Sequence, residues 1–256
     1  MIKRRRKRTL LVDGDIIAYM VSTKAEVPTR WSEDLWTLHS DLNEVKGQFE
    51  NLVYHYQEIT LCTDIVLTFT HSKNFRKKIL PTYKANRNDL RKPVCYGPLK
   101  EYAKETFKTY EKPWLEGDDV LGILHTSSVI NGDKVTLTKD KDLRTVPGQH
   151  YFINAPEHYE DVSIIDADYN HMIQCLQGDS SDNYTGCPGV GVVNATKLLK
   201  DDRHDPVAMW GIVVNRFKKA GLSEDEALIQ AQVSRICRAS DYNFTTKTPI
   251  LWRRPL

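Results

Sequence analysis

The chain has 256 residues, enough for one large α/β domain or two small ones, and its formal net charge of +2 excludes a uniformly basic nucleic-acid coat. Its five cysteines are widely separated and form no C-x-x-C pair, which excludes a disulfide framework and a zinc site. No segment has the roughly 18 apolar residues of a membrane helix, so we expect a protein of the reducing cytoplasm without a membrane partner.

The chain begins with a basic run at residues 3–8, which we expect to be a disordered arm with phosphate contact as an addition. The apolar run Leu10–Val12 follows and ends in Asp13, Gly14 and Asp15. This pattern predicts a buried strand that carries carboxylates into a turn, followed by a helix from Asp15.

An amphipathic helix is predicted over residues 33–57, because apolar side chains recur there in steps of three and four. The stripe consists of Leu35, Leu38, Leu42, Val45, Phe49, Leu52 and Tyr56.

Two further strands are predicted at residues 65–69 and 134–138, each separated from the preceding strand by helical sequence. Strands that alternate with helices favour a mainly parallel sheet covered by helices. After about residue 160 the strand signals fade and the pattern is mostly helical. The sequence therefore predicts an α/β part at 1–160 and a helical part at 161–256.

Acidic residues occur in four short groups, each at an expected strand end or helix start. The groups are Asp13 with Asp15, Glu116 with Asp118 and Asp119, Asp140 with Asp142, and Asp179 with Asp182. If the sheet brings these ends together, each close pair of carboxylates repels by roughly 1 to 4 kcal/mol at 4 Å. Bound cations would make the arrangement favourable, and oxygen-only ligands favour Mg²⁺ or Mn²⁺.

Two such cations about 4 Å apart would stabilise both the attacking and the leaving oxygen of a phosphodiester, which predicts metal-assisted hydrolysis. The alternative interpretation is that Asp15, Asp118 and Asp179 only cap helices, where aspartate is favoured at the first turn. Of the three, Asp15 suits the role of a cap best.

A basic stretch with interleaved aromatic side chains, Phe75 and Tyr83, lies between residues 73 and 92. Such a pattern suits single-stranded nucleic acid, and the alternative is a solvated charged loop. Its cations are Lys73, Arg76, Lys77, Lys78, Lys84, Arg87, Arg91 and Lys92.

A glycine-rich turn at Gly186, Gly189 and Gly191 separates two helical segments, the second of which contains Lys197. Backbone N–H groups at such a turn can bind phosphate without reading bases. A plain connection between helices is one alternative. A dinucleotide-binding loop is another, although the third glycine of that motif is missing.

In combination these motifs resemble the 5′ nuclease or flap endonuclease superfamily, and within it the phage 5′→3′ exonucleases of the T-odd type. The resemblance covers nearly the whole chain. The matching segments are Val12–Asp15, Pro81–Arg87, Leu115–Val120, Thr138–Asp142, Gly178–Asn183, Tyr242–Phe244 and Leu251–Arg253.

The resemblance implies a PIN-like α/β core at 1–160 with a helical arch at 72–94. It also implies a helix-three-turn-helix element at about 178–200 in the helical part 161–256, often with a K⁺ ion. Two divalent cations, Mg²⁺ or Mn²⁺, are implied. The first would be held by Asp13, Glu116, Asp118 and Asp119, and the second by Asp140, Asp142, Asp179 and Asp182.

By the same resemblance Lys84 and Arg87 would steer and polarise the scissile phosphate, acting in catalysis together with Asp118. Tyr83 would contact a terminal base. Duplex DNA would also be contacted by Gly186, Gly189, Gly191 and Lys197.

The sequence departs from the family at the strand before the arch, which in the family closes with an acidic residue and here runs into His71. A neutral imidazole could ligate a metal directly or through water and would favour Mn²⁺ over Mg²⁺ relative to an aspartate.

The expected function is that of a metal-dependent 5′→3′ exonuclease on duplex DNA, with flap cleavage and removal of RNA from RNA–DNA hybrids. Phage DNA replication and primer removal would be its uses, as a monomer in the infected host cytoplasm. The alternatives are a PIN-type endoribonuclease acting on structured RNA and a non-catalytic DNA-binding factor.

Overall fold

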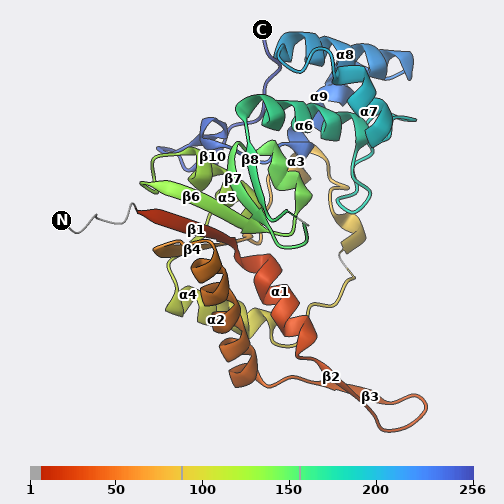
Figure 1. Cartoon of the computed structure of the whole chain (residues 1–256). Coiled ribbons are helices and arrows are strands. Elements are labelled where there is room, and N and C mark those ends of the chain that lie inside the picture. The colour runs from red at the N-terminus through yellow and green to blue at the C-terminus, as the bar shows by residue number, and fades with distance from the viewer. Residues whose placement is uncertain (1–6, 88, 156) are drawn as a thin grey trace, which may run out of the picture.

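A six-stranded sheet forms the centre of the computed structural model, which describes residues 7–87, 89–155 and 157–256. Its strand order is β5-β4-β1-β6-β7-β8 (Figure 1). All neighbouring strands are parallel except β7 and β8, which are antiparallel. The strands are β1 (Arg8–Asp13), β4 (Asp64–Phe69), β5 (Thr109–Glu111), β6 (Asp133–Thr138), β7 (Gly148–Phe152) and β8 (Tyr159–Val162). The three predicted strands and the mainly parallel α/β sheet are therefore confirmed, while most of the basic run 3–8 lies outside the described residues.

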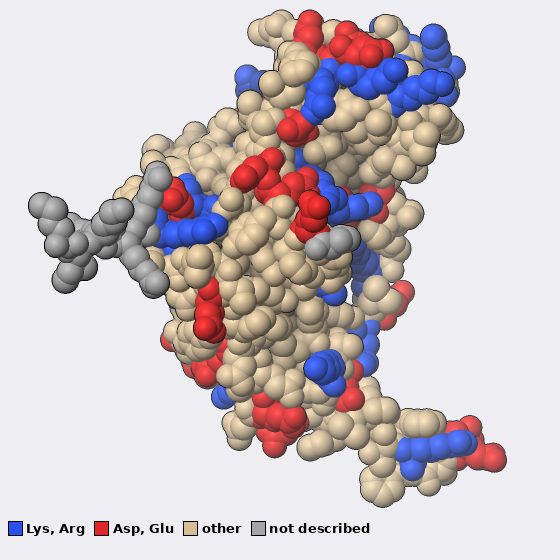
Figure 2. All heavy atoms as spheres, in the orientation of Figure 1, with Lys and Arg blue, Asp and Glu red and all other residues tan. Residues whose placement is uncertain are grey.

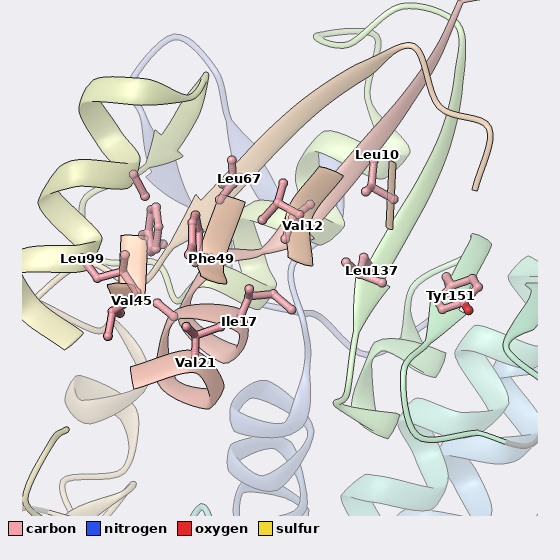
Figure 3. Close-up of a cluster of buried hydrophobic side chains, with 14 of the residues drawn as sticks. Leu10, Val12, Ile17, Val21, Val45, Phe49, Leu67, Leu99, Leu137 and Tyr151 are labelled. Carbon is pink, nitrogen blue, oxygen red and sulfur yellow. The ribbon is translucent and has the colours of Figure 1, made fainter. Parts of the chain in front are cut away.

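Both faces of the sheet are covered, because successive side chains of a strand point to opposite faces. Leu10 and Val12 of β1 pack against α1 (Gly14–Lys24), α2 (Leu42–Ile59) and α4 (Tyr96–Thr106), as Figure 3 shows for this cluster. Leu11 points to the other face, where α5 (Gly117–Thr126) packs. The central strand β1 is thus buried on both sides, and α1 starts directly at its carboxyl end.

The helix predicted over 33–57 begins only at Leu42, so the prediction is wrong for its first third. The Asp41 carboxylate caps α2 by accepting hydrogen bonds from the backbone N–H groups of Asn43 and Glu44. The preceding residues form a hairpin of β2 (Val27–Arg30) and β3 (Trp36–His39). There Leu35 and Leu38 are 54% and 41% exposed, so their helical spacing to the α2 stripe does not reflect a common buried face.

After residue 163 the chain is mainly helical, as the fading strand signals predict. The helices α6 (Ile164–Gln177), α7 (Val192–Leu199), α8 (Pro206–Lys219) and α9 (Glu224–Ser234) surround their own apolar cluster. The following segment returns to the sheet, where Ile236, Cys237 and Tyr242 pack with α5. It contains η3 (Ala239–Asp241), β9 (Tyr242–Asn243) and β10 (Thr248–Pro249).

The region 72–94 contains two short helical pieces, α3 (Arg76–Ile79) and η1 (Ala85–Arg87). It crosses to the helical part, where the backbone N–H of Lys84 donates to the carbonyl of Asp182 at 2.8 Å. The Asn183 side chain in turn donates to the carbonyl of Thr82 at 2.7 Å. These contacts tie the basic stretch to the loop between α6 and α7. Among the described residues, no helix is both long enough and apolar enough to cross a membrane.

Candidate active site

Acidic side chains from separate parts of the chain line one pocket of about 430 Å³. Asp13 ends β1, Glu116 precedes α5, and Asp140 precedes the 3₁₀ helix η2 (Lys141–Thr145) that follows β6. The loop after α6 contributes from the helical part. The structure thereby brings together seven of the eight carboxylates assigned from the sequence, together with Asp15. They are Asp13, Glu116, Asp118, Asp140, Asp142, Asp179 and Asp182.

Burial and mutual repulsion disfavour the charged form of several of these acids. Burial, followed by the charge of Asp15, raises the pKa of Asp13 to about 7. Burial and then Asp140 raise the pKa of Asp142 to about 7. The pKa of Asp118 is raised as well, by burial and then by Asp13 and Asp140. A pocket of this kind is stabilised by protons or by cations.

The donors of the pocket fit a hydrated hard cation. Asp118 Oδ1 is buried and has no hydrogen-bond partner among the described residues, so one carboxylate oxygen is left for a ligand. In the side-chain positions of this structure, the residues described form no group of three or more Asp, Glu, His or Cys that could hold a metal ion. Mg²⁺ retains several waters and is commonly bound through one or two carboxylates, so a preformed cage is not required.

Asp13, and not Asp15, caps the first helix. Asp13 Oδ1 accepts a hydrogen bond from the backbone N–H of Ile16 at 3.0 Å. Asp15 lies one residue inside α1 and lines the pocket. Its Oδ2 accepts from the backbone N–H of Thr70 at 2.6 Å, and its Oδ1 from the Tyr96 hydroxyl at 2.5 Å. The interpretation of Asp15 as a cap is therefore wrong, because two donors hold its carboxylate at the pocket.

The other two proposed caps have different roles. Glu116, and not Asp118, stands at the N-cap of α5 in a capping box with Asp119. Asp179 accepts hydrogen bonds from the backbone N–H groups of Ser181 and Asp182 within a turn.

Asp119 does not line the pocket, and its assignment to a metal needs correction. It is fully buried, and each of its oxygens accepts a hydrogen bond from the Arg76 guanidinium at 2.7 Å. Backbone N–H groups of Glu116 and Cys237 each donate a further hydrogen bond at 3.0 Å. Four donors thus surround the carboxylate and leave no room for a cation.

Arg76 also donates to the backbone carbonyls of Val233 and Arg235, and its Nη1 lies 3.2 Å from Glu116. By sequence Arg76 is only one cation of the basic stretch. Its position as the first residue of α3 gives no sign that it is buried.

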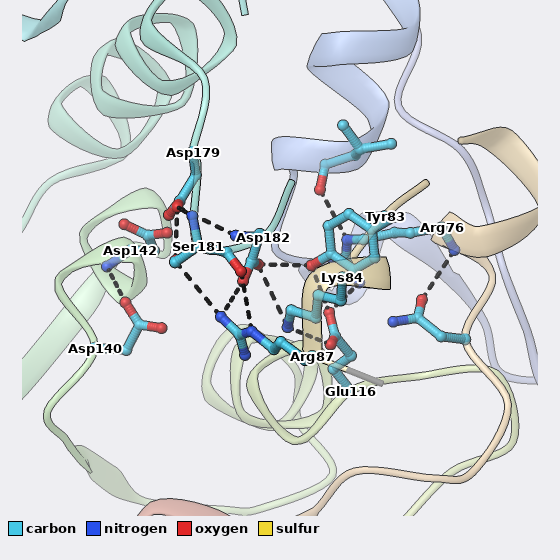
Figure 4. Close-up of polar contacts among 12 residues, drawn as sticks. Arg76, Tyr83, Lys84, Arg87, Glu116, Asp140, Asp142, Asp179, Ser181 and Asp182 are labelled. Carbon is cyan, nitrogen blue, oxygen red and sulfur yellow. Dashed lines mark hydrogen bonds and ion pairs between the residues drawn. The ribbon is translucent and has the colours of Figure 1, made fainter. Parts of the chain in front are cut away.

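Lys84 and Arg87 reach the pocket, as the sequence predicts for the two cations. Figure 4 shows both pointing at Asp182. Lys84 Nζ pairs with Glu116 and lies 3.3 Å from Asp182, while Arg87 Nη2 lies 2.5 Å from Asp182. Burial raises the pKa of Glu116, but Lys84 and Arg76 outweigh it and lower that pKa to about 2. Glu116 is therefore an ionised anchor for cationic side chains.

Tyr83 is not placed to contact a DNA base. It is 2% exposed and packs against Tyr184 with ring centroids 6.4 Å apart. Its hydroxyl lies 2.9 Å from Glu116 Oε2 and 2.8 Å from Asp182 Oδ2. Tyr83 thus contacts two acids of the pocket through its hydroxyl, and its assignment to DNA binding is corrected.

His71 lies outside the pocket lining, whereas its neighbour Thr70 is part of it. The imidazole Nδ1 accepts a hydrogen bond from the backbone N–H of Lys73 at 3.0 Å. A metal-ligating role for His71 is therefore not supported by its position. Asp15 supplies a carboxylate at this end of β4 instead.

The glycine turn has one buried and two exposed glycines. Gly186 is buried with a φ of +61°, and a side chain there would collide with the backbone of Gly178. It therefore serves close packing and does not contact DNA, contrary to the expectation. Gly189 and Gly191 face open space, and Lys197 is exposed on α7.

Charge on the molecular surface is mixed. On the face shown in Figure 2, Lys and Arg side chains gather over the helical part at the top of the view, with acidic side chains beside them. This face has no uniformly basic coat, in agreement with the net charge.

The mainly parallel sheet places the acidic pocket at the carboxyl ends of its strands, where open α/β sheets bind ligands. Residues 8–171 match the family model described as the 5′-3′ exonuclease, N-terminal resolvase-like domain. The chain therefore belongs to the 5′-3′ exonuclease family, as its motifs predict.

Two phage proteins are similar over nearly their whole length. The exonuclease of Escherichia phage T7 is 29% identical over 281 residues, which cover 96% of this chain and 94% of that protein. The exodeoxyribonuclease of Enterobacteria phage T3 is 29% identical over 280 residues, covering 96% and 93%.

Among solved structures, the T5 D15 protein co-crystallised with metal ions has the same fold, with a TM-score of 0.65 at 14% identity and 89% coverage of both chains. A bacteriophage T5 D15 flap endonuclease in a pseudo-enzyme-product complex with DNA and metal ions gives a TM-score of 0.64 at 14% identity, again with 89% coverage of both. The PIN-like 5′ nuclease fold expected from the resemblance is thus confirmed.

Proposed function

We propose that this chain is a divalent-metal-dependent 5′→3′ exonuclease that hydrolyses duplex DNA, with flap cleavage and removal of RNA from RNA–DNA hybrids as related activities. The observation that carries the proposal is the acidic pocket with Lys84 and Arg87 at its side. The names of the phage relatives and the DNA and metal complexes of the T5 protein support it.

We assign two cations, Mg²⁺ or Mn²⁺, to the acids of the pocket and exclude Asp119. Asp13, Asp15 and Asp118 come from β1, α1 and α5, Asp140 and Asp142 follow β6, and Asp179 and Asp182 lie in the loop after α6. When bound, such ions activate water and stabilise the charge that develops on the phosphate oxygens.

Lys84 and Arg87 would bind the scissile phosphate. The Arg87 side chain is 44% exposed and that of Lys84 is 20% exposed, so Arg87 can meet the incoming strand first. Both now pair with Asp182, which is also among the proposed metal ligands. A bound cation would compensate the charge of Asp182, so that Arg87 would be available to the phosphate while Lys84 stays paired with Glu116. Their role is positioning and charge stabilisation.

The turn with Gly189 and Gly191 would hold the duplex by its phosphates, with Lys197 beside it on α7. Gly191 is the N-cap of α7 and no side chain caps this end, so the first backbone N–H groups of the helix have no partner within the helix. A K⁺ ion at this turn belongs to the same proposal. The protein would act as a monomer in phage DNA replication, including primer removal, in the host cytoplasm.

The test uses end-labelled duplex, flap and RNA–DNA hybrid substrates with Mg²⁺, Mn²⁺ or chelator. We expect short products from the 5′ end with either metal and none with chelator. Asp118→Asn should abolish cleavage and leave DNA binding intact or stronger, because it replaces one carboxylate oxygen by an amide nitrogen that cannot bind a cation and removes one repelling charge. Asp225→Asn, an exposed aspartate on α9, is the matched control.

Cleavage of structured RNA alone would replace this proposal with the endoribonuclease alternative. DNA binding without cleavage under any metal would indicate a non-catalytic DNA-binding factor.

A further inference from the structure

A second hollow, of about 620 Å³, lies between α6, α8 and the C-terminal residues 250–255, and it shares no lining residue with the acidic pocket. Its volume is in the range of small-molecule sites, which are commonly about 300 to 1,000 Å³. We call it the arginine cavity, because Arg235, Arg238 and Arg253 line it.

Two of these arginines are almost completely buried, with Arg235 6% and Arg238 5% exposed. Arg238 is fully engaged: it donates to the carbonyl of Thr145 at 2.6 and 3.1 Å and to Asp168 at 2.7 Å. Arg235 Nε donates to Asp241 at 2.8 Å. The Arg238 guanidinium therefore has its hydrogen-bond partners, whereas the Arg235 guanidinium does not use all of its donors.

The unused donor is Arg235 Nη1, which is buried and has no hydrogen-bond partner in the part of the chain that the structure describes. It forms an ion pair with Asp168 Oδ1 at 3.7 Å, too long for a hydrogen bond, and that oxygen already accepts from Arg238. A buried charged donor without an acceptor is costly, and an acceptor from a ligand would remove that cost.

Charge in the arginine cavity favours an anion. Three arginines line it against two acids, Asp168 and Asp241. The buried His171 adds no charge, because burial and then Arg235 lower its pKa well below the ordinary value. Burial also lowers the pKa of Arg238, to about 10, which leaves it protonated at neutral pH.

The remaining walls are apolar and aromatic. Met172, Met209 and Trp252 belong to the lining, and Trp252 packs against the apolar cluster that contains the two methionines. The Trp252 ring is held edge-on by Trp210 and His171, with centroid distances of 5.2 and 5.3 Å. A fixed indole suits a flat heterocycle.

We propose that the arginine cavity binds a nucleoside monophosphate, with the phosphate on Arg235 and the base against Trp252. The inference rests on this cavity and does not depend on the proposed nuclease function. Inorganic phosphate shares the anionic part of this chemistry, and the experiment separates the two.

Calorimetric titration of the full chain in chelator provides the test, with deoxyadenosine 5′-monophosphate, deoxyadenosine and inorganic phosphate as probes. Chelator keeps divalent cations out of the acidic pocket. We expect the monophosphate to bind more tightly than either part alone. Arg235→Gln should weaken it by about tenfold or more, since a hydrogen bond to a charged group is lost, and Arg235→Lys should restore part of the affinity.

Two further variants keep the proposal falsifiable if Arg235→Gln is unstable. Trp252→Leu should weaken the monophosphate and leave inorganic phosphate unchanged. Arg254→Gln, an exposed arginine paired with Glu224, is the matched control and should change neither.

Lys84→Ala distinguishes the two sites, because it alters the acidic pocket alone. Loss of monophosphate binding in that variant would place the ligand in the acidic pocket and overturn the proposal. So would folded Arg235→Gln protein with unchanged affinity, or no binding at millimolar concentration. Equal affinity for inorganic phosphate would overturn the role of Trp252.

Discussion

The Asp15 carboxylate accepts a 2.6 Å hydrogen bond from the backbone N–H of Thr70, so a residue of α1 places its charge at the end of β4. The family resemblance implies an acidic residue at the end of that strand, where this chain has Thr70 and His71. Asp15 therefore stands where a carboxylate is expected, although it comes from a different element.

Asp15→Asn should lower cleavage with Mg²⁺ by at least about 10²-fold, because loss of a ligand charge costs several kcal/mol in the transition state. Tyr96→Phe removes only one donor to that carboxylate and should cost about tenfold or more, as for other groups that orient ligands. The double variant Asp15→Asn with Thr70→Asp should regain part of the activity. Single-turnover rates measure all three, and full activity of Asp15→Asn would contradict the assignment.

His71→Asp should leave cleavage with Mg²⁺ or Mn²⁺ within about twofold of the parent rate, which is the usual effect of a substitution away from special contacts. The imidazole accepts a hydrogen bond from Lys73 N–H and does not line the acidic pocket. Rates with each metal provide the check. A selective change in the Mn²⁺ rate would show that His71 reaches a metal.

Lys84→Ala should lower the cleavage rate by about 10² to 10³-fold, as for the loss of one group that stabilises transition-state charge, without unfolding the protein. The melting temperature and DNA affinity are measured on the same samples. An unaltered rate would remove Lys84 from the proposed mechanism.

Lys197→Ala should instead weaken duplex binding and leave the single-turnover rate at saturating DNA unchanged.

Arg76→Met should destabilise the fold by about 3 to 5 kcal/mol, because it leaves the buried Asp119 carboxylate without its partner. The double variant Arg76→Met with Asp119→Leu removes both charges and should be much closer to the parent in stability. Urea unfolding measures the free energies. Equal destabilisation in both variants would show that the ion pair is not the cause.

Saturating Mg²⁺ should raise the melting temperature, since a ligand at 100 times its Kd stabilises the fold by about 2.7 kcal/mol. Asp13 and Asp142 have a pKa near 7 in the folded chain, raised from 3.8. Without metal, the stability from their protonation is complete below about pH 3.8 and is lost as the pH rises through about 7. The Mg²⁺-induced rise in melting temperature should therefore be larger at pH 8 than at pH 6. At either pH it should be smaller in Asp118→Asn than in the parent protein, and differential scanning fluorimetry measures both effects. An equal rise in Asp118→Asn would contradict the metal site.

The elements that the sequence predicts well are those with strong local signals. The apolar run Leu10–Val12 and its two neighbours form the strands, and Asp13 of β1 meets Asp140 after β6 at one edge because parallel strands share that edge. The helix predicted from the spacing of Leu35 and Leu38 is wrong there, since helical spacing does not show whether a side chain becomes buried.

Other features depend on contacts between residues far apart in the chain. Arg76 and Asp119 are 43 residues apart, and nothing local distinguishes Asp119 from Asp118 as the partner of a buried guanidinium. Tyr83 similarly reads as a stacking aromatic in a basic stretch until its hydroxyl is seen between Glu116 and Asp182. Such assignments require the fold.

The contacts of Arg76 with the carbonyls of Val233 and Arg235 have a consequence for biosynthesis. Glu116 and Asp119 at the start of α5 are held by Arg76, which is itself held by backbone carbonyls at and after the end of α9. A growing polypeptide lacks these carbonyls until Arg235 has been added. The acidic pocket therefore cannot be fully assembled before α9 has been made, and a shorter chain would carry its acids without the framework that sets them in place.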